Sequence, residues 1–192
     1  MNKNNIEVEL KYRVKDEKKL NKWLEKNAKK IFEKRQVDKY YTPVHKNFFG
    51  EKYPREYLRI RDSDGHFSIT YKYWHSTEIE GEYSHCDEYE TDLEDGNQME
   101  KIFKALDLKL LVIVDKTRTT YHYKNFEIEI DDVKDVGHIC EIEIKSKYKD
   151  VDEAREMIKN LAEELGFNEE DREKDLKMGY VYMIAKKKGL IK

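Results

Sequence analysis

Apolar and polar residues alternate with a period of two along most of the chain, which is typical of strands that bury one face. The alternating segments are rich in Tyr, Ile, Val and Thr, which strands favour. We predict seven strands, at residues 6–14, 57–61, 66–74, 82–91, 117–123, 126–133 and 139–147. The sequence Asp62-Ser63-Asp64-Gly65 predicts a hairpin turn between the second and the third of them.

Apolar residues at helical spacing predict four helices in the remaining parts of the chain. These residues are Leu20, Trp23 and Leu24; Met99, Ile102, Phe103 and Leu106; Ala154, Met157, Ile158, Leu161 and Leu165; and Leu176, Tyr180, Met183 and Ile184. Gly166 is expected to end the third helix as a C-terminal cap. Many strands with few helices between them indicate an antiparallel α+β fold. Because no linker or repeat divides the 192 residues, we expect a single domain over residues 1–192.

The composition limits the classes of partner. Charged residues make up 41% of the chain, and 38 Lys and Arg against 41 Asp and Glu leave a net charge of −3. Stable nucleic-acid binding is disfavoured, because phosphate contacts call for a basic surface. No apolar run approaches the ~18 residues of a membrane span, and the N-terminus does not resemble a secretion signal. We therefore expect a cytoplasmic protein without membrane binding, and a homodimer stays open.

The polar face of each predicted strand is charged at nearly every position. In the first strand Glu7, Glu9 and Lys11 share a face, since side chains at i, i+2 and i+4 point the same way. The other strands repeat this pattern with Arg59 and Arg61; Lys72; Glu88 and Glu90; Lys116 and Arg118; Glu127, Glu129 and Asp131; and Glu141, Glu143 and Lys145. One such strand alone usually marks a solvated surface. Repetition over seven strands favours a charged face that points inward.

Such an inward face combines two chemistries. Carboxylate pairs bind divalent metals through oxygen, and magnesium favours carboxylates together with substrate phosphates. Lys and Arg pairs bind phosphate oxygens, and the guanidinium group does so with two parallel hydrogen bonds. A closed sheet lined with both signs therefore indicates a site for a metal-bound polyphosphate.

Six motifs in order resemble those of the CYTH superfamily, also called triphosphate tunnel metalloenzymes. Residues 7–11 resemble its E-x-E-x-K signature, and residues 36–41 resemble Q-x-D-x-Y-Y. Residues 58–61, 70–72 and 116–118 resemble L-R-I-R, T-Y-K and K-x-R, and residues 131–143 resemble D-x-V-x-x-x-G-x-x-x-E-x-E. The resemblance extends to near residue 184. Where cyclase-like members often have Ser-Tyr near the C-terminus, this chain has Gly179-Tyr180.

The resemblance implies an eight-stranded antiparallel β-barrel, the triphosphate tunnel, with helices packed outside, and Mg²⁺ or Mn²⁺ as cofactor. The residues implied as metal ligands are Glu7, Glu9, Asp131, Glu141 and Glu143. The residues implied in binding the triphosphate are Lys11, Arg59, Arg61, Lys72, Lys116, Arg118, Glu88 and Glu90. Lys11, Arg59 and Lys72 of this set are expected to be catalytic.

The resemblance defines the ligand class better than the reaction. The wording of the first strand and of residues 36–41 is closer to class IV adenylate cyclase-like members, which would convert ATP to cyclic AMP and pyrophosphate. A triphosphatase acting on thiamine triphosphate, inorganic triphosphate or a nucleoside triphosphate is the first alternative. A non-catalytic module that binds polyphosphate or nucleotide is the second, although it would not need the metal carboxylates. The substrate is thus expected to be a small molecule containing a triphosphate.

Overall fold

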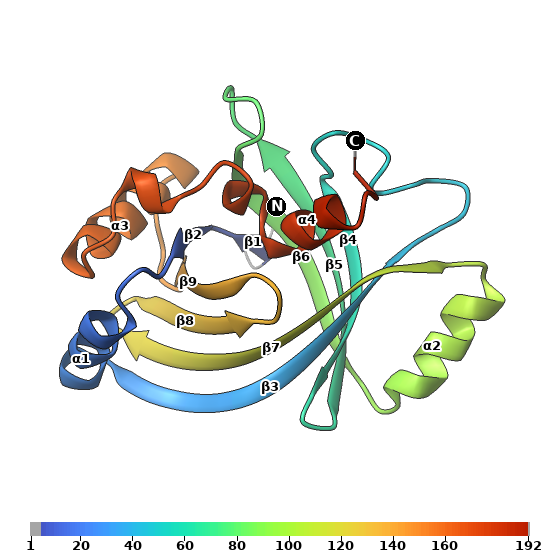
Figure 1. Ribbon diagram of the computed structural model, residues 1–192, viewed down its shortest axis with the longest axis horizontal. Helices are drawn as coiled ribbons and strands as arrows, with labels where there is room; N and C mark the ends of the chain where they lie inside the picture. Colours follow the sequence, from blue (N-terminus) through green and yellow to red (C-terminus); the bar gives the residue numbers. More distant parts are fainter. Residues whose placement is uncertain (1–4, 192) are drawn as a thin grey trace.

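The computed structural model describes residues 5–191, and one antiparallel sheet of nine strands forms a nearly closed barrel in it (Figure 1). The strands are β1 (Ile6–Glu7), β2 (Glu9–Arg13), β3 (Lys29–Thr42), β4 (Glu56–Ser63), β5 (His66–Ser76), β6 (Tyr83–Leu93), β7 (Lys109–Tyr123), β8 (Phe126–Val133) and β9 (Gly137–Ile144). Their order in the sheet is β1-β6-β5-β4-β3-β7-β8-β9-β2. The predicted antiparallel α+β barrel is thereby confirmed.

The two ends of the sheet meet at the N-terminal segment of the chain. β1 pairs with β6 at one end of the order, and β2 pairs with β9 at the other. Only Val8 separates the two strands, so the segment predicted as one strand is interrupted there. This break makes nine strands where eight were expected, and it places Glu7 and Glu9 beside opposite edges of the sheet.

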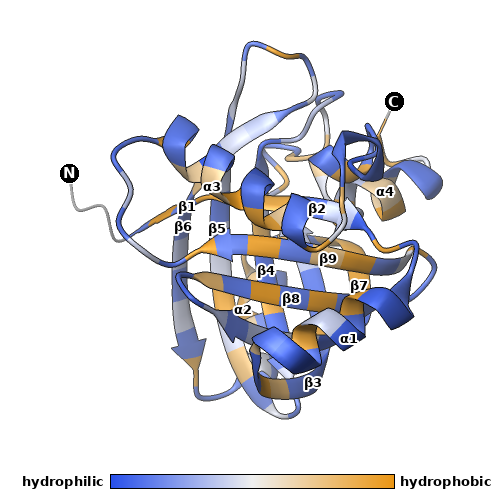
Figure 2. Cartoon of the chain, turned by 90° about the vertical axis from the view of Figure 1, so that its left-hand side faces the viewer, coloured by the Kyte–Doolittle hydropathy of each residue, from blue (hydrophilic) through white to orange (hydrophobic). Residues whose placement is uncertain are grey.

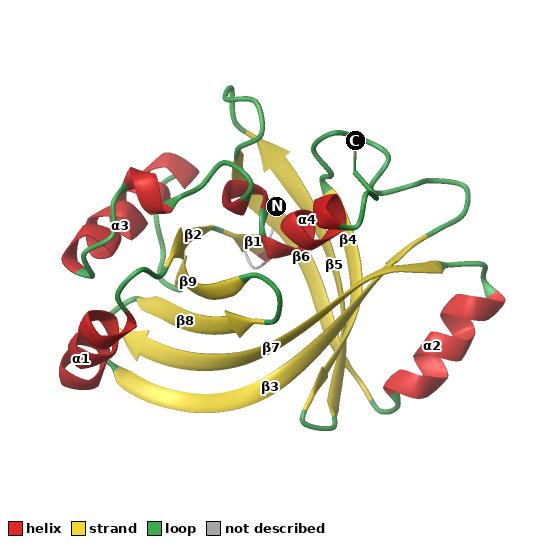
Figure 3. Cartoon of the chain, in the orientation of Figure 1, coloured by secondary structure: helices red, strands yellow, loops and turns green. Residues whose placement is uncertain are grey.

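Four helices lie outside the sheet (Figure 3). They are α1 (Glu17–Asn27), α2 (Gly96–Ala105), α3 (Val151–Glu164) and α4 (Tyr180–Lys187), with the 3₁₀ turns η2 (Glu169–Asp171) and η3 (Leu176–Met178) before α4. Asp16, Asp95 and Asp150 cap the first three helices by accepting backbone N–H groups of the first turn. Gly166 follows α3 with a φ of +90°, as its predicted capping role requires.

Two strand predictions were incomplete. β3 was not predicted, because charged residues occupy both faces of its first half, 29–35, and hide the alternation. β7 begins at Lys109 and not near Thr117, because residues 110–114 are all apolar and show no alternation of polar and apolar positions.

The fourth predicted helix is divided in the structure, since Gly179 separates η3 from α4. The predicted hairpin joins β4 and β5, and Asp64 and Gly65 form its positive-φ turn.

The main apolar core lies outside the barrel wall. Leu10, Ile128 and Ile142 point outward from β2, β8 and β9 and pack with Leu24 of α1 and Ile158 of α3. Figure 2 shows the resulting alternation of hydrophobic and hydrophilic positions along β8 and β9. The opposite faces of these strands are consequently left to the barrel interior.

A second apolar cluster fills the interior on the side of α4. It contains Val112 and Val114 of β7, Val133 of β8, and Leu176 and Ala185 of the C-terminal segment. In Figure 1 α4 lies above the sheet, close to the label of β4. This cluster closes one side of the interior and confines the polar residues to the remaining space. No helix among residues 5–191 has the length and apolar character needed to cross a membrane.

Candidate functional site

The barrel interior contains a cavity of about 270 Å³ with a strongly charged wall. Every residue of the predicted inward face lines it except Lys116 and Asp131. The charged lining residues are Glu7, Glu9, Lys11, Arg59, Arg61, Lys72, Glu88, Glu90, Arg118, Glu127, Glu129, Glu141, Glu143 and Lys145. The alternation pattern therefore identified the interior face of the strands correctly.

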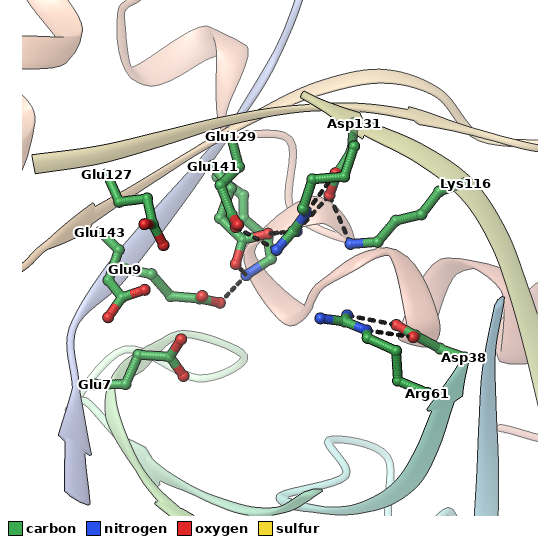
Figure 4. A network of polar contacts seen from close by, with 12 residues as sticks. Glu7, Glu9, Asp38, Arg61, Lys116, Glu127, Glu129, Asp131, Glu141 and Glu143 are labelled. Atoms are coloured by element: carbon green, nitrogen blue, oxygen red, sulfur yellow. Dashed lines mark hydrogen bonds and ion pairs between the residues drawn. The ribbon is translucent and has the colours of Figure 1, made fainter. Parts of the chain in front are cut away.

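One part of the wall is a row of carboxylates on three neighbouring strands. Glu143 of β9 lies directly opposite Glu9 of β2 on one side and Glu127 of β8 on the other. Such cross-strand pairs have their Cβ atoms about 4.5–5.5 Å apart, and like charges there repel. Glu7 of β1 points toward the same region (Figure 4). We call Glu7, Glu9, Glu127 and Glu143 the acidic row.

Lysines compensate the acidic row incompletely. Lys145 Nζ lies 2.6 Å from Glu143 and 3.5 Å from Glu127, and it is half exposed. Lys72 binds Glu7, and Lys11 binds Glu9. Both of these lysines also contact another carboxylate, at 3.5 Å for Lys72–Glu88 and 3.2 Å for Lys11–Glu141. The four carboxylates of the acidic row therefore have three lysine partners, and each of these lysines also contacts a second carboxylate.

The pKa values show the consequence. Burial and the neighbouring Glu7 raise the pKa of Glu143 to about 8, so this carboxyl group takes up a proton in the absence of a further cation. Burial also raises the pKa of Glu7, but the charge of Lys72 outweighs it and the pKa falls to about 2. Glu9 Oε2 is buried and has no hydrogen-bond partner among the described residues. The row thus has unused capacity for a cation.

This donor set fits a divalent metal that retains water and substrate ligands. Among residues 5–191, no three His, Cys, Asp or Glu side chains converge closely enough to form a complete metal cage. Magnesium rarely uses such a cage, because one or two carboxylates, waters and substrate phosphates complete its octahedron. Glu7, Glu9 and Glu143 are the carboxylates of this row that could supply one or two ligands to such an ion.

Arginine and lysine side chains from β4 and β5 face the same cavity. Arg61 forms two hydrogen bonds with Asp38, of 2.6 and 2.7 Å, and Asp38 is fully buried. Arg59 donates to Thr70 at 3.1 Å and to Glu90 at 3.1 Å. Burial lowers the pKa of Arg59, but Asp38 and other acids outweigh it and raise that pKa well above its usual value. Both guanidinium groups are charged, oriented and in contact with the cavity.

Lys116, Arg118 and Asp131 form a buried ion cluster beside the cavity. Asp131 Oδ2 accepts from Lys116 Nζ at 2.9 Å and from Arg118 Nη2 at 2.6 Å. The side chains of Lys116 and Asp131 are fully buried, whereas Arg118 also reaches Glu141 at 2.9 Å and lines the cavity. Two of the residues predicted to contact ligand or metal are therefore held behind the wall.

Several residues in or directly behind the cavity wall were given no site role in the sequence analysis. Asp38, which orients Arg61, lies in the Q-x-D-x-Y-Y segment, so that motif could have identified it. The ring of Trp74 lines the cavity with Lys11 Nζ 5.7 Å and Lys72 Nζ 5.9 Å from its centroid. Nothing in the alternation distinguishes Trp74 from an ordinary wall residue. Tyr180 was noted as a residue of the fourth predicted helix and in the departure from Ser-Tyr, without a role in the site.

The C-terminal segment contributes the last part of the wall. Met178, Gly179, Tyr180 and Val181 line the cavity where α4 begins. Gly179 has a φ of +88° and gives α4 no side-chain cap. The first backbone N–H groups of a helix carry partial positive charge, which favours anions nearby. The segment therefore adds to the cationic character of this side.

A nearly closed barrel with carboxylates and cations facing one interior cavity defines the class of triphosphate tunnel proteins. Residues 5–176 match the CYTH domain, and the chain belongs to this family. Family members include adenylate cyclase-like proteins and triphosphatases, and the tunnel enzymes use divalent metals.

Similar proteins agree with this membership. A protein of Methanocaldococcus jannaschii named "Putative adenylate cyclase MJ0240" is 35% identical over 162 residues, which are 81% of this chain and 89% of the relative. The PH1012 protein of Pyrococcus horikoshii shares the fold with a TM-score of 0.73 and 27% identity, over 90% of this chain and 97% of that one. HpAC1 of Hippeastrum shares only the fold, with a TM-score of 0.56 and 15% identity, over 83% of this chain and 88% of that one.

Proposed function

We propose that the protein is a metal-dependent enzyme that converts ATP to cyclic AMP and pyrophosphate in the barrel cavity. The observation that carries this proposal is that carboxylates and cations line one cavity, with four of the carboxylates gathered in the acidic row. The acidic row lies on β1, β2, β8 and β9, and the cations Arg59, Arg61 and Lys72 lie on β4 and β5. A triphosphate placed between them would face the cations on one side and share a metal ion with the carboxylates on the other.

The cations would bind the triphosphate in exchange for their present partners. Arg59 would turn from Glu90, whose side chain is nearly half exposed, toward phosphate oxygens. Arg61 would keep its two hydrogen bonds to Asp38, which hold its guanidinium group in place. Lys72 and Lys11 would leave carboxylates that the metal then compensates. Charge-assisted hydrogen bonds of this kind are the strong ones in phosphate recognition.

The reaction forms one bond and breaks one. The ribose 3′-oxygen bonds to the α-phosphorus, the bond from that phosphorus to the bridging α–β oxygen breaks, and pyrophosphate leaves as the hydroxyl proton is released. A divalent ion bound by Glu7, Glu9 and Glu143 would polarise the phosphoryl group and neutralise charge on the leaving group. Lys11, Arg59 and Lys72 would hold the phosphates in line and stabilise the charge that develops.

The relative from Methanocaldococcus jannaschii supports the cyclase reaction through its name and its 35% identity. Hydrolysis is the second candidate. The solved Hippeastrum protein is described as revealing a dominant triphosphatase activity, although its 15% identity relates it only by fold. The charge of the cavity wall favours this candidate as much as the first, because a wall of carboxylates and cations suits phosphates whatever group they carry.

The reaction is tested by separating products. The protein is incubated with ATP, with thiamine triphosphate and with inorganic triphosphate, in Mg²⁺ or in Mn²⁺. Cyclic AMP and pyrophosphate are expected from ATP. ADP and phosphate from ATP, or turnover of the other two substrates alone, would contradict the cyclase and favour a triphosphatase. Binding of all three without any product would favour the non-catalytic module.

The metal site is tested at Glu9. Glu9→Gln keeps the size of the side chain and removes its charge from the acidic row, so we expect metal-dependent turnover to be abolished while the fold is kept. Glu33→Gln is the matched control, since Glu33 pairs with Lys30 at 2.7 Å on the exposed surface of β3. Unchanged activity of Glu9→Gln would remove Glu9 from the metal site.

A further inference from the structure

Tyr180 is the first residue of α4, and its hydroxyl group lies beside two cations at the wall of the cavity. Its side chain is buried, and Tyr180 is one of the residues that line the cavity. Lys116 Nζ lies 2.6 Å from the phenol oxygen, and Arg118 Nη2 lies 3.5 Å from it. Both neighbours belong to the buried ion cluster, which fixes them through Asp131.

The identity of these neighbours determines the direction of the hydrogen bonds. Ammonium and guanidinium groups donate and never accept. The phenol oxygen is therefore the acceptor of both contacts, and its own proton must point elsewhere. Among residues 5–191, no group accepts a hydrogen bond from the Tyr180 hydroxyl. Burial raises the pKa of Tyr180 well above its usual value, so the proton stays on the oxygen.

We propose that the Tyr180 hydroxyl binds a phosphate oxygen of the triphosphate, and that Lys116 positions this hydroxyl without touching the ligand. This inference rests on the proposed function, because it assigns a further residue to the same site. The proton of Tyr180 is the part of this arrangement that remains free for an anion. Donation by Lys116 into the phenol oxygen also polarises the O–H bond, which makes it a better donor.

The same arrangement explains why Lys116 is not itself placed as a phosphate ligand. Its side chain is fully buried, it does not line the cavity, and Asp131 and Tyr180 occupy two of its three donors. Its influence on the cavity therefore passes through Tyr180, which does line the wall. Tyr180 thus extends the phosphate-binding set to the C-terminal segment, outside all the charged strand motifs.

Tyr180→Phe removes only the hydroxyl and keeps the ring over which Lys116 Nζ lies at 4.9 Å. Affinity for tripolyphosphate is measured by calorimetry in the presence of Mg²⁺. Loss of one hydrogen bond to a charged group should weaken binding about 10-fold. Tyr182→Phe is the matched control, because Tyr182 lies on the same helix, is buried and does not line the cavity. Its affinity should equal that of the unmodified protein.

A double-mutant cycle tests the positioning role of Lys116. Lys116→Met should weaken binding only through the lost orientation of Tyr180. Adding it to Tyr180→Phe should therefore cause little further loss. If the two losses multiply, Lys116 contacts the ligand independently and the positioning role is wrong.

A second pair of substitutions tests the inference without relying on Tyr180→Phe alone. Tyr180→Gln retains both an acceptor for Lys116 and an N–H donor, whereas Tyr180→Leu retains neither. Higher affinity of the Gln variant is expected, and equal affinity of the two would overturn the inference, as would unchanged affinity of Tyr180→Phe. Failure of the unmodified protein to bind tripolyphosphate would instead overturn the proposed function.

Discussion

The acidic row and the buried ion cluster differ in how completely their charges are compensated. Asp131 receives both Lys116 and Arg118, with distances of 2.6–2.9 Å, and is fully buried. Burial raises the pKa of Asp131, but Arg118 and Lys116 outweigh it and lower that pKa. Glu143 has a half-exposed lysine as partner and two carboxylates opposite it, and its pKa rises to about 8. Figure 4 shows the two regions on different sides of the network.

This difference separates two uses of the same residue types. A buried charge that is fully paired holds its neighbours in place and has little left for a ligand. A carboxylate that lacks a sufficient partner retains affinity for a cation. We therefore infer that the acidic row serves the metal and that Asp131 serves the orientation of Arg118 and Lys116.

The largest expected effect is a contrast in stability between the two regions. Asp131→Asn leaves Lys116 and Arg118 without their shared counter-charge, so the free energy of unfolding should fall by about 3–5 kcal/mol. Glu143→Gln replaces a carboxyl group that is protonated in chelator near pH 5.5, so at that pH it should change this free energy by less than about 1 kcal/mol. Urea denaturation of both variants checks the contrast. Equal losses would show that the two regions are compensated alike.

The second expected effect is the joint stabilisation by metal and tripolyphosphate. Ten inward carboxylates, with Asp38 included, against seven cations give the interior an acidic excess, which metal relieves and triphosphate increases. The shift in melting temperature with both ligands should exceed the sum of the separate shifts, because each neutralises the other. A ligand at 100 times its Kd adds about 2.7 kcal/mol. A full shift with tripolyphosphate in chelator would mean a metal-free anion site.

The third expected effect concerns the cations opposite the acidic row. Arg59→Ala should weaken binding of tripolyphosphate by about 1.5–3 kcal/mol, the scale of a charge-assisted hydrogen bond. Arg59→Lys should also bind more weakly, since one ammonium group cannot replace the two-pronged guanidinium. Arg35→Ala is the control, because Arg35 pairs with Asp115 on the exposed side of β3. Unchanged affinity of both Arg59 variants would exclude Arg59 from the phosphate site.

Periodicity was sufficient to predict the fold where one face of a strand differs from the other. Leu10, Ile128 and Ile142 alternate with interior carboxylates, and all three lie in the core outside the barrel. β3 was not predicted from periodicity, because both faces of its first half carry exposed charged residues such as Lys30 and Glu33. The break at Val8 could not be predicted, since it depends on where the two sheet edges meet and not on local sequence.

The sequence was sufficient to predict which residues face the barrel interior, but not which role each of them has there. The alternation placed Lys116 and Asp131 on the same inward face as Arg59 and Glu9, and all four do point away from the outer core. Depth along the barrel decides which of them meets the cavity, and the apolar cluster around Val114 and Leu176 sets that depth. Because this cluster comes from distant parts of the chain, strand periodicity carries no signal of it.

The fourth expected effect is a pH dependence that comes from Glu143. In the folded protein its pKa is about 8, against 4.5 as the ordinary value. Between these values the folded state holds a proton that the unfolded state has released, so stability is greatest at the low end and falls as the pH rises. One proton changes the free energy of unfolding by at most about 1.4 kcal/mol per pH unit.

The measurement compares the unmodified protein with Glu143→Gln by urea denaturation at pH 5.5, 6.5 and 7.5 in chelator. Subtracting the variant cancels the histidines and the other carboxyl groups that titrate in both proteins. As the pH rises, the free energy of unfolding of the unmodified protein should fall relative to that of Glu143→Gln. Saturating Mg²⁺ should reduce this slope, because the ion replaces the proton as the partner of the acidic row. A flat difference in chelator would mean that Glu143 is ionised throughout and that Lys145 alone compensates it.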